Sequence, residues 1–131
     1  MRVDLHHLKA LWELRSQIAT RRMSLATQSI AGAMTQFHAL SAESAQVTGR
    51  LGVPLDQPTA RARLEDLQRR LKSAAEHRLR DARQLHGERE NHRLVRARCE
   101  RRIEMWDDLL GQMAARDEAR QEAVSENGIV E

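Results

Sequence analysis

The side chains best suited to chemistry in this 131-residue chain are six histidines and one cysteine, Cys99. A zinc site on a helix needs ligands one turn apart, or His combined with Cys or carboxylates. His6 and His7 are adjacent, and no two histidines are three or four residues apart. Neither HExxH nor Glu-x-x-His, the pattern of di-iron bundles, occurs. The sequence therefore predicts no metal site.

Cys99 gives no sign of being a nucleophile. A catalytic thiol needs a positioned base and a pocket, whereas Cys99 falls on an apolar helical stripe, where we expect a buried and inert side chain. The glycines occur singly, and no GxGxxG or GxxxxGK[ST] loop is present. We predict a protein that is not an enzyme and that has neither a cofactor nor a small-molecule substrate. A single cysteine also excludes an intrachain disulfide framework.

The composition favours long helices over a thick core. Hydrophobic residues make up 40% of the chain, but it has one Phe, two Trp and no Tyr. Aromatic side chains normally supply much of the buried area of a globular core. Leu and Ala are instead mixed with Arg, Glu and Gln, all of which are good helix formers. We predict an all-α protein with thin apolar contacts between helices.

One strong break divides the chain. Gly49, Gly52, Pro54 and Pro58 fall within ten residues in "GRLGVPLDQP", and Gly and Pro together end helices. We predict a helix over residues 4–50, a turn over 51–58, a second helix over 59–126 and a frayed tail over 127–131. Gly87 is expected to be a soft spot in the second helix, since Gly costs about 1 kcal/mol relative to Ala there.

Apolar residues recur at helical spacing in both segments. The first stripe is predicted to contain Leu8, Leu11, Leu14, Ile18 and Leu25, then Met23, Ala26, Ile30, Ala33, Phe37, Leu40, Val47 and Leu51. Its drift between Ile18 and Ile30 resembles a coiled-coil stutter. The second stripe is predicted to contain Leu64, Leu67, Leu71, Ala75, Leu79, Ala82 and Leu85, then Val95, Cys99, Ile103, Trp106, Leu110 and Met113.

Two amphipathic helices joined by a short turn predict an antiparallel coiled-coil hairpin, a single elongated domain spanning residues 1–131. If the turn centres near Pro54, residue i lies opposite residue 109 − i. The second helix then lacks an intrachain partner from Met105 onward. Four apolar side chains would overhang and need cover from outside the hairpin: Trp106, Leu109, Leu110 and Met113.

The net charge of +3 is distributed unevenly along the chain. Residues 1–60 carry +2, residues 61–102 carry +7 and residues 103–131 carry −6. The basic block could contact phosphates. It has no aromatic stacking residues, however, and carboxylates alternate with arginines at turn spacing, as in Glu65 with Arg69, Asp66 with Arg70 and Glu76 with Arg80. We therefore do not favour nucleic acid as the partner.

The N-terminus lacks the pattern of a secretory signal, and no run of residues is long and apolar enough to cross a bilayer. We expect a cytoplasmic protein.

The opening "LKALWELRSQIATRR", the Gly/Pro turn, the overlong second helix and the ending "RCERRIEMWDDLLGQMAARDEARQEAVSEN" together resemble the FliJ/YscO stalk family of flagellar and type III secretion systems. The resemblance implies a rod that sits in a hexameric export ATPase, contacts the export gate protein and hands on secretion chaperones. It places the protein at the periphery of a membrane-embedded secretion apparatus. The paired ends near Leu8, Leu11, Ile103 and Trp106 would enter the ATPase, and the Gly49–Pro58 tip would face the gate.

We predict that a protein-binding surface is formed by Leu8, Leu11, Trp12, Ile103, Trp106, Leu109, Leu110 and Met113. Two other interpretations remain open besides the stalk: an export chaperone or adaptor that presents these residues to a groove, and a self-assembling coiled coil in which they form a homodimer. A basic coiled coil associated with nucleic acid is a weaker alternative.

Overall fold

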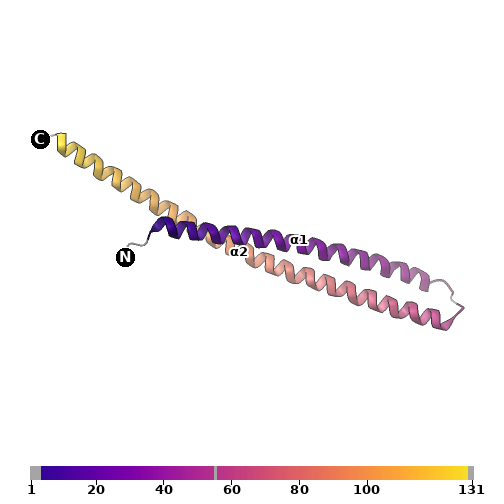
Figure 1. Cartoon of the computed structure of the whole chain (residues 1–131). Coiled ribbons are helices and arrows are strands. Elements are labelled where there is room, and N and C mark those ends of the chain that lie inside the picture. The colour runs from indigo at the N-terminus through magenta and orange to yellow at the C-terminus, as the bar shows by residue number, and fades with distance from the viewer. Residues whose placement is uncertain (1–3, 55, 130–131) are drawn as a thin grey trace. The chain divides into compact units, whose positions relative to one another are not determined.

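The chain forms two α-helices joined by a short turn (Figure 1). The computed structural model describes residues 4–54 and 56–129. Helix α1 runs over Leu5–Leu51 and helix α2 over Pro58–Ile129, and no strand occurs among the described residues. The predicted all-α hairpin with a longer second helix is confirmed.

Capping and proline residues explain where the two helices begin. The Asp4 Oδ1 atom accepts a hydrogen bond of 3.0 Å from the backbone N–H of His6, which caps the start of α1. Pro58 opens α2, where its missing N–H costs nothing. Helix α2 extends to Ile129, three residues beyond its predicted end at residue 126, and residues 130–131 lie outside the described part. It also continues through Gly87 without a break.

By its internal contacts the chain divides into two compact units. Unit 1 comprises Met1–Arg21 and His92–Glu131, and unit 2 comprises Arg22–Asn91. Each unit therefore contains part of α1 and part of α2. The organisation as one domain stays a prediction, and the two units are described separately below.

Covered side chains recur on α1 in a strict alternation of three and four residues. We call this row the α1 seam. Its members, all buried or half-buried, are Leu5, Lys9, Trp12, Ser16, Ala19, Met23, Ala26, Ile30, Ala33, Phe37, Leu40, Ser44, Val47 and Leu51. Because the alternation has no interruption, the predicted stutter between Ile18 and Ile30 is wrong.

The α2 seam keeps the same alternation, with Arg78 as its one exposed position among the described residues. Its covered members are Leu64, Gln68, Leu71, Ala75, Ala82, Leu85, Arg89, His92, Arg96, Cys99, Ile103, Trp106 and Leu110. Three consecutive members, Arg89, His92 and Arg96, are polar. The apolar pattern of the sequence fades at this point for that reason.

Several large apolar residues predicted for the stripes are instead exposed: Leu11, Leu14, Ile18, Leu25, Leu67, Val95 and Met113. For the six residues other than Met113 the physical reason is their phase on the helix, whereas Met113 continues the spacing of the α2 seam, three residues after Leu110, but lies beyond its last covered position. Each residue turns a helix by about 100°, so Leu11 points away from the row that contains Trp12. A small or polar residue in phase, such as Ser16 or Ala19, is covered in preference to a larger one out of phase.

The buried positions are all occupied by small side chains. They are Ala19, Ala26, Ser44, Val47, Ala75, Ala82 and Cys99. No third element of the described residues packs against the two helices, so only a short side chain can be covered on all sides. A Leu or Phe in the same row remains exposed to solvent on one side. Small residues also let two backbones approach closely. The helices therefore pack closely over a narrow core.

Cross-helix polar contacts within each unit fix the register. In unit 2, Gln68 Nε2 donates to Thr48 Oγ1 over 2.6 Å, and Arg89 Nη1 donates to Thr27 Oγ1 over 3.5 Å. In unit 1, Lys9 Nζ lies 2.5 Å from Asp107 Oδ1. In each pair the two residue numbers add to 116.

The predicted register, in which opposing numbers add to 109, is therefore wrong by seven residues. Seven residues is one heptad, and a shift of one heptad returns the same face of a coiled coil to the contact. The apolar period alone cannot distinguish these two registers. Side chains also lean toward the N-terminus of their own helix. Two side chains that touch across the hairpin therefore come from residues with higher numbers than the two residues whose Cα atoms lie level with the contact.

Candidate protein-interaction surface

The predicted binding residues all lie in unit 1. Unit 1 contains an arginine-lined groove with a volume of about 580 Å³. Its lining residues are Trp12 and Arg15 from α1, and Val95, Arg98, Cys99, Arg101, Arg102 and Met105 from α2. Cys99 lies at its base with 2% of its surface exposed, which confirms the predicted burial of this side chain.

Two guanidinium groups lie against the ring of Trp12. The Cζ atom of Arg15 is 4.8 Å from the ring centroid, and that of Arg102 is 5.6 Å away. Both distances are within the range of cation–π attraction, which is worth about 0.5–1 kcal/mol at exposed sites. Arg15 belongs to the same helix as Trp12, whereas Arg102 comes from α2. Trp12 therefore joins the two helices of unit 1 through its π face as well as its apolar area.

The groove is strongly basic, since four of its eight lining residues are arginines and none is acidic. Its apolar lining comes from Trp12, Val95, Cys99 and Met105. An apolar floor edged by guanidinium groups suits a helix that carries both apolar and carboxylate side chains, because Arg pairs well with carboxylates.

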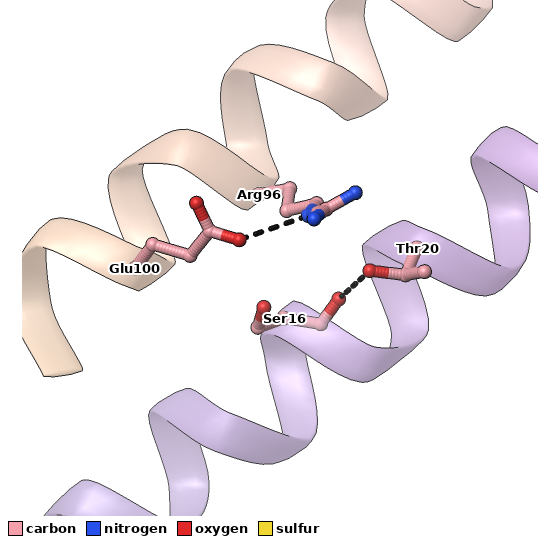
Figure 2. A network of polar contacts seen from close by, with 4 residues as sticks. All are labelled: Ser16, Thr20, Arg96 and Glu100. Atoms are coloured by element: carbon pink, nitrogen blue, oxygen red, sulfur yellow. Dashed lines mark hydrogen bonds and ion pairs between the residues drawn. The ribbon is translucent and has the colours of Figure 1, made fainter.

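Two polar contacts of unit 1 each lie within a single helix (Figure 2). On α2 the Arg96 Nε atom donates to Glu100 Oε1 over 2.9 Å, and on α1 the Thr20 hydroxyl donates to the Ser16 carbonyl oxygen over 2.9 Å. Bonds of this kind support each helix separately.

The ion pair between Lys9 and Asp107 connects α1 to α2 near the start of α1. The hydrogen bond to the Asp107 carboxylate raises the pKa of Lys9, and the charges of Asp107 and Glu13 act in the same direction, while desolvation opposes them. Lys9 Nζ also lies 3.7 Å from Glu13 Oε1. This contact places Asp107, a neighbour of Trp106, opposite the first turns of α1.

The predicted overhang accordingly begins later than expected. Ile103, Trp106 and Leu110 belong to the α2 seam and are half-buried, as are Leu8 and Trp12 on α1. The side chains become exposed without exception only from Gly111 to Gly128. The difference from the predicted start at Met105 is the consequence of the heptad shift in register.

Trp106 has a further feature. Its Nε1–H is covered and has no hydrogen-bond acceptor among the described residues. A donor left unpaired in this way costs about 1–3 kcal/mol. The apolar area of the ring, and not a polar bond, therefore holds Trp106 in the seam.

Leu11, Leu109 and Met113 remain available for a partner. All three are exposed, by 43%, 38% and 48%. Sequence reasoning thus gave a mixed set: five of the eight predicted residues lie in or beside the contact between the helices, and three face outward. It missed Arg15, Arg98, Arg101 and Arg102. The signal that could have found them is their spacing around Trp12 and Cys99 once the correct register is known.

Part of the basic block in unit 2 is paired with carboxylates of the same helix. Arg70 Nη2 lies 3.0 Å from Asp66 Oδ2, and Arg80 Nη2 lies 3.9 Å from Glu76 Oε2, as predicted. Glu65 pairs with Arg61 over 3.3 Å and not with Arg69, so that predicted pair is wrong. These exposed pairs support a solvated helix more than a phosphate-binding surface.

Comparisons with family models, with curated proteins and with solved structures give no match to this chain. Over the residues that the structure describes, neither α1 nor α2 contains a stretch long and apolar enough to span a membrane. The described residues also include no group of three or more His, Cys, Asp or Glu side chains suited to a metal ion.

Proposed function

We propose that the chain is a non-enzymatic, cytoplasmic coiled-coil stalk protein of the FliJ/YscO type that serves a type III secretion export ATPase. Its partners would be the ATPase hexamer, the export gate protein and secretion chaperones. The observation that carries the proposal is the hairpin layout, in which α2 continues beyond the start of α1 as a single exposed helix, Gly111–Gly128.

A shaft for a hexameric ring must be narrow, and its surface must present contacts on several sides. A helix with side chains is about 10–12 Å across, and the exposed segment of eighteen residues adds about 27 Å at 1.5 Å per residue. The exposed Leu11 near the start of α1, together with Leu109 and Met113 on α2, offers apolar contacts next to this segment.

The turn offers a second and distinct contact. Val53 is 59% exposed between the two helices, in the Gly49–Pro58 tip that the family resemblance assigns to the export gate. Leu11 and Val53 thus provide a matched pair of exposed apolar side chains in different units. Trp106 and Leu110 are unsuitable for this comparison because truncating seam residues would weaken the hairpin itself.

The test uses the purified full-length chain, the purified export ATPase of the same secretion system and the purified cytoplasmic domain of its gate protein. Rates of ATP hydrolysis and equilibrium binding are measured for wild type, Leu11→Glu and Val53→Glu. We expect saturable stimulation of the ATPase by wild type. We expect Leu11→Glu to weaken ATPase binding about tenfold or more, since it buries a carboxylate at an apolar contact.

Val53→Glu serves as the matched control, and it should bind the ATPase like wild type while losing affinity for the gate domain. Failure of wild type to bind or stimulate the ATPase at tens of micromolar would contradict the proposal. Equal ATPase binding by wild type and Leu11→Glu would contradict the assignment of this end to the ATPase. Selective binding of a secretion chaperone alone would favour the adaptor interpretation instead.

A further inference from the structure

Each helix of unit 1 carries a second row of residues beside the seam, with the same alternation of three and four residues. On α1 the row contains Leu8, Leu11, Arg15 and Ile18. On α2 it contains Val95, Arg98, Arg102, Met105 and Leu109. An interval of three plus an interval of four is close to two full turns, so each row stays on one face of its helix. We call these two sets the flank rows.

The flank rows lie on the same side of the hairpin in unit 1. The arginine-lined groove is bordered by Arg15 from the α1 row and by Val95, Arg98, Arg102 and Met105 from the α2 row. The Arg102 Cζ atom lies 5.6 Å from the centroid of the Trp12 ring, so this side chain reaches across to α1. The groove therefore runs between the two rows, with Trp12 in its lining.

The flank rows combine open apolar area with positive charge. Five of their apolar side chains are between 38% and 44% exposed: Leu11, Ile18, Val95, Met105 and Leu109. Their arginines, Arg15, Arg98 and Arg102, form no ion pair with any residue that the structure describes. Neither row contains a carboxylate. A partner that fits this surface must supply both apolar area and negative charge.

The other side of the same hairpin is polar and acidic. The rows at the corresponding spacing run over residues 6–20 of α1 and 93–107 of α2, and Ala10 and Ala97 are their only apolar members. They carry four carboxylates: Glu13, Glu100, Glu104 and Asp107. Three of these four already pair with Lys9 or Arg96. Only the side with the flank rows thus has the uncovered apolar surface that is typical of an interaction site.

We propose that the flank rows bind an acidic amphipathic α-helix of a partner protein, which lies along the groove between α1 and α2. The apolar stripe of the partner helix covers Ile18, Met105 and the neighbouring apolar side chains. Carboxylates beside that stripe pair with Arg98 and the other arginines of the rows, in charge-assisted hydrogen bonds. This is recognition of a helix in a groove, and it does not depend on the proposed role in secretion.

The dimensions and the period of the surface favour a helix as the occupant. Residues 95–109 rise by about 21 Å at 1.5 Å per residue, which is the length of about two heptads of a partner helix. Positions in both rows recur every three and four residues, so a third helix meets them at regular intervals. A nucleic acid would pair with the arginines but would leave five exposed apolar side chains without a contact.

A second copy of this chain matches the surface less well. Two sets of flank rows placed face to face would bring arginines toward arginines. The exposed segment Gly111–Gly128 does carry carboxylates, but Val124 is its only large apolar residue after Met113. Such a segment cannot cover both rows, so the occupant is expected to come from a different protein.

The test uses the full-length chain and a synthetic acidic helix of three heptads, with Leu at both core positions and Glu beside them. Sedimentation checks that this probe is monomeric, and fluorescence anisotropy measures its binding up to about 200 micromolar. We expect a dissociation constant on the order of micromolar, weakened several-fold as salt is raised. A probe with Lys in place of Glu, and another with Ser in place of Leu, should each bind about tenfold more weakly or worse.

Variants of the chain locate the contact. Arg98→Glu should weaken binding of the acidic probe about tenfold through like-charge repulsion, and Met105→Ser should weaken it about fivefold through lost apolar contact. The matched controls are Arg83→Glu and Leu67→Ser, which make the same type of change at exposed positions of unit 2. Both controls should bind the probe like wild type, and circular dichroism checks the helicity of all four variants.

Tryptophan fluorescence gives a second readout, because Trp12 and Trp106 are the only tryptophans of the chain. In Trp106→Phe, the emission of Trp12 should shift to shorter wavelength when the probe covers the groove. In Trp12→Phe, the emission of Trp106 should move less, since Trp106 lies outside the groove lining.

Absence of saturable binding by wild type over the whole range overturns the proposal. Unchanged binding by Arg98→Glu and Met105→Ser also overturns it, because the contact would then lie elsewhere. Tighter binding of a uridine 20-mer RNA than of the acidic helix would assign the arginines to phosphates instead. A homodimer of the chain alone that Met105→Ser dissociates would assign the flank rows to a second copy.

Discussion

Units 1 and 2 contain segments of the same two helices, but they expose their apolar side chains very differently. Of the twelve exposed large apolar residues in the described chain, three belong to unit 2: Leu25, Val53 and Leu67. The other nine belong to unit 1. Both units nevertheless bury small residues at their seams, such as Ala75 and Ala82 in unit 2 and Ala19 and Cys99 in unit 1.

The apolar side chains of the two units differ in what they contact. In unit 2 most apolar residues are in phase with the seam and are used for pairing the helices. In unit 1 a second set is out of phase with the seam, including Leu11 and Leu14 on α1 and Met105 and Leu109 on α2. Exposed apolar side chains that gather in one region mark interaction sites. Unit 2 is therefore the region that mainly holds the hairpin, and unit 1 is the region suited to partners.

The largest expected effect comes from overfilling the seam of unit 2. Ala82 is buried at the close contact of the helices, so Ala82→Leu should force the backbones apart and destabilise the protein by about 1–3 kcal/mol. Urea unfolding followed by circular dichroism measures this change.

Ala119→Leu is the control for the same substitution at an exposed position of α2 in unit 1. Both residue types are good helix formers, so its effect should remain within about 0.5 kcal/mol. Equal effects at the two positions would mean that Ala82 does not set the spacing of the helices.

A smaller and local effect is expected from Trp12→Ala in unit 1. The variant loses the half-buried ring and both cation–π contacts, with Arg15 and Arg102. The cost should be about 1–2 kcal/mol, below that of a fully buried aromatic residue. Hydrogen exchange should show roughly tenfold faster exchange of amides in residues 5–21 and 92–110.

Trp12→Phe provides the comparison, because it keeps an aromatic face and should retain most of the protection. Amides of unit 2 should exchange at the wild-type rate in both variants. Faster exchange throughout unit 2 would show that the two units open together and that their separation has no energetic meaning.

Most of the fold could be predicted from the sequence. The Gly/Pro cluster before Pro58 located the turn, and the apolar period identified both helices. The register could not be predicted in the same way, because a shift of one heptad leaves the same residues facing inward. Contacts such as that between Thr48 and Gln68 decide it, and they involve polar residues that an apolar pattern ignores.

The candidate surface was predicted less well for a related reason. Hydrophobicity selected Leu11 and Leu14 for the seam, although the phase set by Trp12, Ser16 and Ala19 excludes them. A different error, the one in register, assigned Trp106 to a free overhang. Residues that lie out of phase, such as Met105 and Leu109, can be recognised only when the full row of covered positions is known.

The smallest expected effect concerns the ion pair that connects α1 to α2 in unit 1. The pKa of Lys9 is raised above 10.5 by its hydrogen bond to Asp107, so folding favours the protonated amine. The resulting stabilisation is fully present below pH 10.5 and is lost as the pH rises through the raised pKa. Because the pair is exposed, it should also weaken as salt is added.

Thermal unfolding of wild type and Lys9→Met at pH 8 and pH 11.5 measures this effect. The melting temperature of the variant should be slightly lower at pH 8, and the difference should disappear at pH 11.5 or when Asp107→Asn is already present. Lys72→Met is the matched control, since Lys72 is the other lysine of the chain and forms no ion pair among the described residues. If Lys72→Met shows the same pH dependence, the effect belongs to net charge and not to the contact that fixes the first turns of α1 against α2.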